Sequence, residues 1–120
     1  MTEKRLLVVD DQLEMSDLVR QVAESLAYEV WMASDGKEFM RAFDKFDPTV
    51  VMLDILMPGI DGIELVRWLK DRGYGAKVFV ATAFDPKYAK MAESIGAAEG
   101  LDVSYISKPF EVADLRAALS

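Results

Sequence analysis

The stretch Thr49-Val50-Val51-Met52-Leu53-Asp54 decides the fold of this chain. Its apolar and β-branched residues form a continuous run, which is typical of a strand buried on both faces of a parallel sheet. The run ends at Asp54 and Ile55 follows, so this acid stands between apolar neighbours. A buried carboxylate costs on the order of several kcal/mol unless it is paired or metal-bound. Asp54 is therefore the first candidate for a reactive residue.

Four similar runs predict four more strands, at residues 6–9, 29–33, 77–81 and 103–106. Apolar residues at helical spacing predict helices over 13–26, 35–46, 61–73, 85–96 and 111–119. This alternation is typical of an α/β domain with a doubly wound, five-stranded parallel sheet and helices on both faces. We expect a single domain over residues 1–120, because a chain of 120 residues has room for one sizeable core.

Polar residues stand at the carboxyl ends of the predicted strands, where doubly wound sheets bind their ligands. They are Asp10 and Asp11 after the first strand, Asp54 after the third, Thr82 after the fourth and Lys108 after the fifth. Three carboxylates in one shallow site repel one another unless a hard divalent cation neutralises them, and Mg²⁺ is the expected cation. Together with a lysine and a hydroxyl, such a cation would neutralise the oxygens of a phosphoryl group received by Asp54.

Composition excludes much of the remaining chemistry. The chain contains neither cysteine nor histidine, which excludes disulfides, thiolate nucleophiles, zinc–thiolate sites and every catalytic triad that needs an imidazole. The formal net charge of −7 gives no electrostatic footprint for nucleic acid or anionic lipid, so proteins and cations are the expected partners. No apolar run approaches membrane-spanning length, and a cytoplasmic location is expected.

The strand-end motifs together resemble the receiver domain of two-component response regulators, and the chemotaxis-type receiver in particular. The resemblance is carried by Asp10-Asp11, by Asp54-Ile55-Leu56-Met57-Pro58-Gly59-Ile60-Asp61-Gly62, by Thr82-Ala83 and by Lys108-Pro109-Phe110. It covers essentially the whole chain. Each motif alone is weak, but all four occur in the family's order and at the ends of predicted strands. The resemblance implies a flavodoxin-like sheet with strand order 2-1-3-4-5.

The same resemblance implies how a phosphoryl group and a metal would be held. Asp54 would be the phosphoacceptor. Asp11, Asp54 and the backbone carbonyl of Leu56 would bind Mg²⁺ directly, while Asp10 would act mostly through water. Mn²⁺ is an expected substitute for Mg²⁺.

The resemblance also implies a switch and its partners. Thr82 and Lys108 would hold the phosphoryl oxygens, and movement of the threonine hydroxyl would let the aromatic ring of Tyr105 rotate inward. A histidine kinase or histidine phosphotransfer protein would donate the phosphoryl group. An output domain or downstream protein would contact the face formed by the fourth helix, fifth strand and fifth helix, and a homodimer through that face is a further expectation. Such a domain catalyses only its own phosphorylation and dephosphorylation and is otherwise not an enzyme.

One departure from the family pattern lies before the fifth strand. Gly96-Ala97 is separated from Lys108 by about one helical turn more than in familiar receivers. Segment 97–102 either extends the fourth helix, with Gly100 as the residue that follows its C-cap, or forms a longer loop.

A second departure concerns two positions that flank the site. Leu56 and Phe84 are apolar, whereas family members often carry polar residues there that assist a hydrolytic water. We hypothesise that these two side chains shield the acyl phosphate and lengthen its life.

Two alternative functions remain open. A receiver-like protein-binding module regulated without phosphorylation would not need the complete set of five strand-end residues. Haloacid-dehalogenase-like phosphohydrolases also use a strand-end Asp with Mg²⁺, but they place a second Asp two residues after the nucleophile, where this chain has Leu56. Their acidic metal pair also follows the nucleophile, whereas Asp10 and Asp11 precede Asp54.

Overall fold

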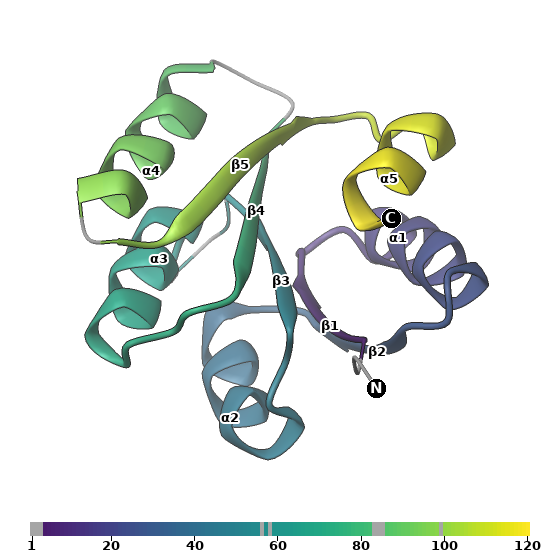
Figure 1. Ribbon diagram of the computed structural model, residues 1–120, viewed down its shortest axis with the longest axis horizontal. Coiled ribbons are helices and arrows are strands. Elements are labelled where there is room, and N and C mark those ends of the chain that lie inside the picture. The colour runs from purple at the N-terminus through teal and green to yellow at the C-terminus, as the bar shows by residue number, and fades with distance from the viewer. Residues whose placement is uncertain (1–3, 56, 58, 83–85, 99) are drawn as a thin grey trace.

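Strands and helices alternate strictly along the chain, as the sequence predicted (Figure 1). The computed structural model describes residues 4–55, 57, 59–82, 86–98 and 100–120. The strands are β1 (Arg5–Val9), β2 (Glu29–Ala33), β3 (Val50–Asp54), β4 (Lys77–Thr82) and β5 (Asp102–Ser107). The helices are α1 (Leu13–Ser25), α2 (Gly36–Phe46), α3 (Gly62–Asp71), α4 (Pro86–Ala98) and α5 (Val112–Leu119).

The strands form one parallel sheet in the order β2-β1-β3-β4-β5, which confirms the predicted topology. The chain moves outward from β1 to β2, then crosses back to β3 on the other side of β1. The strand order reverses there, and the carboxyl ends of β1 and β3 lie side by side, with Val9 opposite Leu53. In sheets of this kind the reversal point is where ligands bind.

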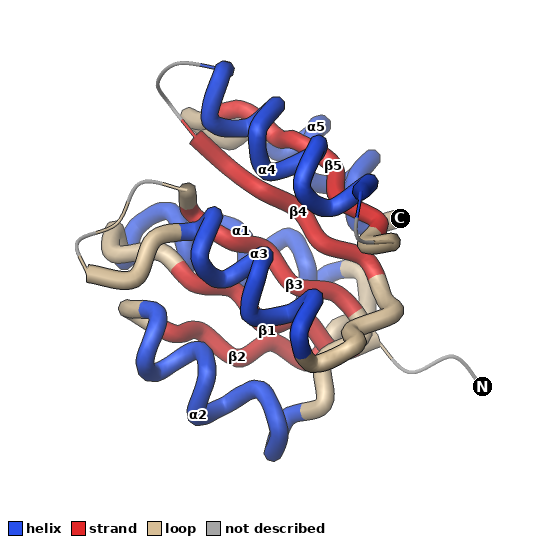
Figure 2. Tube along the Cα trace, turned by 90° about the vertical axis from the view of Figure 1, so that its left-hand side faces the viewer, coloured by secondary structure: helices blue, strands red, loops and turns tan. Residues whose placement is uncertain are grey.

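Helices cover both faces of the sheet. Figure 2 shows α2, α3 and α4 in front of the strands, with α1 and α5 behind them. Alternate strand residues enter two core clusters: Leu7 belongs to the cluster that contains Phe39 of α2, and Leu6 to the one that contains Val19 of α1. Each such fully buried side chain contributes about 1.5–3 kcal/mol. Burial on both faces explains why β1 and β3 are continuous apolar runs.

Aspartates begin two of the helices. Asp35 and Asp61 are the N-caps of α2 and α3, and each side chain accepts a hydrogen bond from a backbone N–H three residues later. Gly73, with φ +69°, follows the end of α3 as predicted. Among the described residues, none of the helices combines the length and the apolar character needed to cross a membrane.

Residues 97 and 98 extend α4, and residue 102 already belongs to β5. The helix runs through Ala98, and Gly100 has φ +78°. The backbone N–H of Leu101 donates to the Gly96 carbonyl at 2.7 Å, and that of Gly100 donates to the Ala97 carbonyl at 3.4 Å. This pair of bonds is the Schellman motif, in which glycine adopts the left-handed conformation after the C-cap. The helical alternative left open by the sequence is therefore confirmed.

Candidate metal and phosphoryl site

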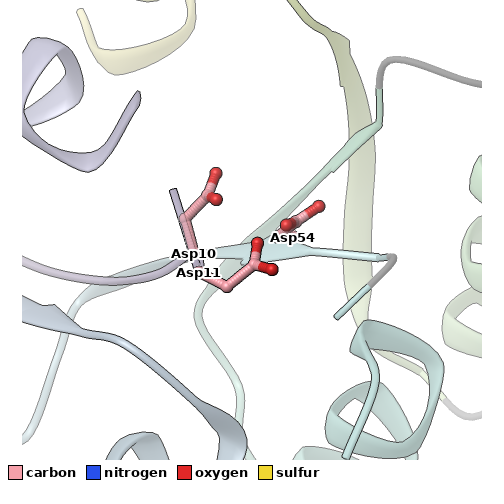
Figure 3. Close-up of side chains that lie close together, drawn as sticks. All are labelled: Asp10, Asp11 and Asp54. Carbon is pink, nitrogen blue, oxygen red and sulfur yellow. The ribbon is translucent and has the colours of Figure 1, made fainter. Parts of the chain in front are cut away.

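Asp10, Asp11 and Asp54 come together at the carboxyl edge of the sheet (Figure 3). Val9 of β1 pairs with Leu53 of β3, so the residues that follow them, Asp10 and Asp54, lie side by side. One carboxylate oxygen from each of the three residues lies within 4.8 Å of the others. Asp10 and Asp54 are each 5% exposed, whereas Asp11 is exposed. The fold thus gathers the three predicted carboxylates into one group.

Lys108 reaches this group from the segment that follows β5. Its Nζ lies 2.5 Å from Asp10 Oδ2 and 3.3 Å from Asp54 Oδ2, and its side chain is 6% exposed. The peptide bond between Lys108 and Pro109 is cis. A single ammonium balances one of the three carboxylates, so the group keeps an excess of negative charge when all three are ionised.

The electrostatic surroundings of Asp54 oppose its ionisation. Burial, followed by the negative charge of Asp10, raises the pKa of Asp54 from 3.8 to about 7, although Lys108 acts to lower it and Asp11 raises it slightly further. A divalent cation among these carboxylates would favour the ionised form. The chemistry of the donor set fits Mg²⁺, because it consists of oxygens only and carries excess negative charge.

Asp10 has a second partner in addition to Lys108. The backbone N–H of Gln12 donates to Asp10 Oδ1 at 2.8 Å, while Oδ2 faces Lys108. An aspartate two residues before an amide at a helix start is typical of an Asx turn, and this spacing is the signal that could have found it. Both oxygens of Asp10 are therefore engaged by the chain itself.

The remaining predicted site residues are placed to different extents. Thr82 is the last residue of β4, next to Ala81, which pairs with Asp54; its side chain is outside the described part. Tyr105 lies on the edge strand β5 opposite Val80 and is 38% exposed. Leu56 and Phe84 lie outside the described residues.

Comparison with known proteins identifies the family. Residues 6–120 match the response regulator receiver domain. The chain belongs to this family. This receiver domain is 34% identical to the chemotaxis protein CheY of Halobacterium salinarum over 117 residues, which cover 98% of this chain and 94% of that protein. The match places the chain in two-component signalling and does not favour a phosphohydrolase.

Other relatives are longer than this receiver domain. The transcriptional regulatory protein TrcR of Mycobacterium tuberculosis is 34% identical over 115 residues, covering 96% of this chain and 43% of that protein. The alkaline phosphatase synthesis transcriptional regulatory protein PhoP of Bacillus subtilis is 32% identical over 114 residues, covering 95% of this chain and 46% of that protein. The chain thus spans less than half the length of these two regulators.

Solved structures share the fold over nearly the whole chain. The chemotaxis protein CheY4 of Vibrio cholerae superimposes with a TM-score of 0.84 at 25% identity, covering 98% of this chain and 97% of that one. A signal receiver domain from Bermanella marisrubri gives a TM-score of 0.83 at 28% identity, covering 98% and 96%. These likenesses agree with the flavodoxin-like arrangement predicted from the sequence.

Proposed function

We propose that this receiver domain accepts a phosphoryl group on Asp54, with Mg²⁺ bound alongside, from a phosphohistidine of a kinase or phosphotransfer protein. The observation that carries the proposal is the buried carboxylate of Asp54 at the end of the central strand, beside Asp10, Asp11 and Lys108. A relative named sporulation initiation phosphotransferase F, from Bacillus subtilis, is 28% identical over 120 residues and supports this chemistry. Residues 1–120 would act as one receiver domain in the cytoplasm.

Asp11, Asp54 and the backbone carbonyl of Leu56 would hold the metal ion, and Mn²⁺ would substitute for Mg²⁺. Asp10 would act through water, since Gln12 and Lys108 already engage its two oxygens. The bound cation would neutralise charge on the carboxylates and on the phosphoryl oxygens. Asp11, which is exposed, is the member of the group that an incoming ion meets first.

The transfer step needs no general base. One oxygen of the ionised Asp54 carboxylate forms a bond to phosphorus while the bond from phosphorus to the donor's imidazole nitrogen breaks, and that nitrogen keeps the electron pair. Lys108 Nζ, 3.3 Å from Asp54 Oδ2, is close enough to contact an oxygen of the attached phosphoryl group. Thr82 would donate its hydroxyl to another oxygen.

Readout would pass through Thr82 and Tyr105 to the α4-β5-α5 face, where an output domain, a downstream protein or a second copy would bind. Tyr105 is suited to this role because it lies on the edge strand and is partly exposed. Leu56 and Phe84 would shield the acyl phosphate from water. If polar residues at these two positions left the dephosphorylation rate unchanged, the shielding role would be wrong.

Intact-mass measurement after incubation with acetyl phosphate and Mg²⁺ tests the proposal. We expect a gain of one phosphoryl group, absent without Mg²⁺ and absent in Asp54→Asn. Asp71→Asn, which removes an exposed carboxylate at the end of α3, should gain the group like the parent. No gain in the parent would support a binding module regulated without phosphorylation, and rapid catalytic turnover of the donor would support a phosphohydrolase.

A further inference from the structure

The first turns of α2 and α3 share one sequence pattern, Asp-Gly-x-Glu, at residues 35–38 and 61–64. In each case the aspartate is the N-cap and accepts a hydrogen bond from the backbone N–H of the glutamate, at 2.8 Å in α2 and 2.9 Å in α3. The glycine is then the first helical residue, and it is buried in both helices. Helix capping explains the aspartates but not the glycines, because glycine is a poor helix former.

Gly62 lies directly against the backbone of the candidate phosphoacceptor. A Cβ at this position would stand 2.6 Å from the Asp54 carbonyl oxygen and 2.7 Å from Ile55 Cα. The Gly62 N–H also donates to the Ile55 carbonyl at 3.0 Å. The start of α3 therefore packs directly against the end of β3. Because the neighbouring atoms belong to the backbone, no side-chain rotation could make room for a larger residue at this position.

Gly36 makes the corresponding contact from α2. A Cβ at this position would stand 2.6 Å from Ile60 Cβ and 2.9 Å from Ile60 Cγ2. Ile60 lies in the segment between β3 and α3 and packs against the core cluster that contains Phe39 and Leu65. The first residue of α2 therefore contacts Ile60, two residues before Gly62.

We propose that Gly62 and Gly36 are positioning residues for Asp54: by lacking a Cβ they let α3 pack on the backbone of Asp54 and Ile55 and let α2 pack on Ile60, and these contacts fix the position of the Asp54 backbone. The inference rests on the proposed function of Asp54. An added methyl group at Gly62 must open a 2.6 Å contact with the Asp54 carbonyl by several tenths of an ångström. The Asp54 carboxylate would shift relative to Lys108 Nζ, 3.3 Å away, and to the other two aspartates.

Displacements of this size matter for metal binding and group transfer. Changes to residues that orient metal ligands typically cost 10- to 100-fold in metal affinity, and small misplacements of a reacting group lower rates comparably. A Cβ at Gly36 would meet Ile60, with its carbonyl oxygen at 3.2 Å, and would not meet Asp54 itself, so the effect on Asp54 should be smaller and should depend on Ile60.

The test compares Gly62→Ala and Gly36→Ala with Gly75→Ala. A Cβ at Gly75 would meet nothing within 4 Å, and its φ lies outside the left-handed range, so it reports the general effect of replacing glycine. We expect Gly62→Ala to weaken Mg²⁺ binding about 10-fold, Gly36→Ala to weaken it less, and Gly75→Ala to leave it unchanged. In the metal-free protein, the amide resonances of Asp54 and Ile55 should shift in the first two variants only.

Ile60→Gly in the Gly36→Ala background supplies the rescue. It removes the two atoms nearest to the added methyl group, so Mg²⁺ affinity and the Asp54 amide resonance should return toward those of Ile60→Gly alone. Comparison of Gly36→Ala with the double variant Gly36→Ala/Ile60→Gly tests the inference even if Gly62→Ala does not fold. The inference is overturned if the folded variants lose only stability while Mg²⁺ affinity and the Asp54 resonance match those of Gly75→Ala. Failure of the parent to bind Mg²⁺ or gain a phosphoryl group would instead overturn the proposed function.

Discussion

Opposing influences act on the ionisation of the Asp54 carboxyl group. Burial and Asp10 raise its pKa to about 7, while Lys108 favours its charged form. The phosphoryl acceptance proposed for Asp54 requires the ionised carboxylate, and the metal-free site opposes that state. A bound divalent cation would remove the conflict, so metal binding and readiness for transfer are linked at this single residue.

The raised pKa predicts how the stability of the metal-free protein depends on pH. The folded state binds a proton at Asp54 more tightly than the unfolded state does. The contribution of Asp54 to the unfolding free energy is therefore fully present below about pH 4 and is lost as the pH rises through 7. Asp54→Asn stays neutral and avoids that loss. We expect its advantage over the parent in unfolding free energy to widen by about 1–3 kcal/mol between pH 5 and pH 8.

Urea denaturation without Mg²⁺ at both pH values measures this change. Asp71→Asn, at an exposed position, should show a difference from the parent that does not vary with pH. An advantage of Asp54→Asn that is the same at pH 5 and pH 8 would contradict the raised pKa.

Lys108 offers a second test at the scale of single residues. Lys108→Met removes the ammonium that pairs with Asp10 and Asp54, and these three side chains are each 6% exposed or less. Two buried carboxylates left without this partner should lower the unfolding free energy at pH 8 by about 3 kcal/mol in the absence of metal. Lys77→Met breaks the more exposed pair with Asp102 and should cost about 1 kcal/mol or less.

Added Mg²⁺ distinguishes this explanation from simple loss of packing. Because Mg²⁺ would balance the same carboxylates, it should stabilise Lys108→Met more than it stabilises the parent. Equal stabilisation of the two proteins would argue that Lys108 acts mainly through its apolar stem.

At the scale of elements, the strands could be predicted because burial on both faces leaves continuous apolar runs such as that of β3. The apolar pattern does not fix the strand ends: it predicts β5 over 103–106, whereas the strand spans Asp102–Ser107. The end of α4 could not be decided from sequence, because a glycine at residue 100 suits both a helix cap and a loop. Only the hydrogen bonds from Leu101 and Gly100 back into the helix distinguish the two.

The Schellman end of α4 gives a prediction for Gly100. Its φ of +78° is unfavourable for residues with a Cβ, although an added methyl group would meet no other atom within 4 Å. Gly100→Ala should therefore lower the unfolding free energy by about 1 kcal/mol through backbone strain alone. Gly75→Ala, without a left-handed φ, is the control, and equal denaturation midpoints for the two variants would contradict the motif.

At the level of the whole molecule, the candidate metal and phosphoryl site depends on the topology of the sheet. Asp10 and Asp11 follow β1, Asp54 ends β3 and Lys108 follows β5, so only the folded sheet brings them together. Their gathering could be predicted because parallel strands end at one edge. The balance of charge among these side chains could not be predicted from the sequence, since it depends on distances such as that from Lys108 Nζ to Asp10 Oδ2. The close approach of Gly62 to Asp54 likewise leaves no signal in the sequence beyond the glycine itself.

Assembly of the site from distant segments predicts that Mg²⁺ stabilises the whole domain. The unfolded chain cannot present Asp10, Asp11 and Asp54 within 4.8 Å of one another, so the ion should bind the folded state alone. At 100 times its dissociation constant, Mg²⁺ should raise the unfolding free energy by about 2.7 kcal/mol. Asp11→Asn should lose most of this gain and Asp71→Asn none of it, as measured by urea denaturation at several Mg²⁺ concentrations. A gain that is equal in all three proteins would mean that the ion acts by general screening and not at this site.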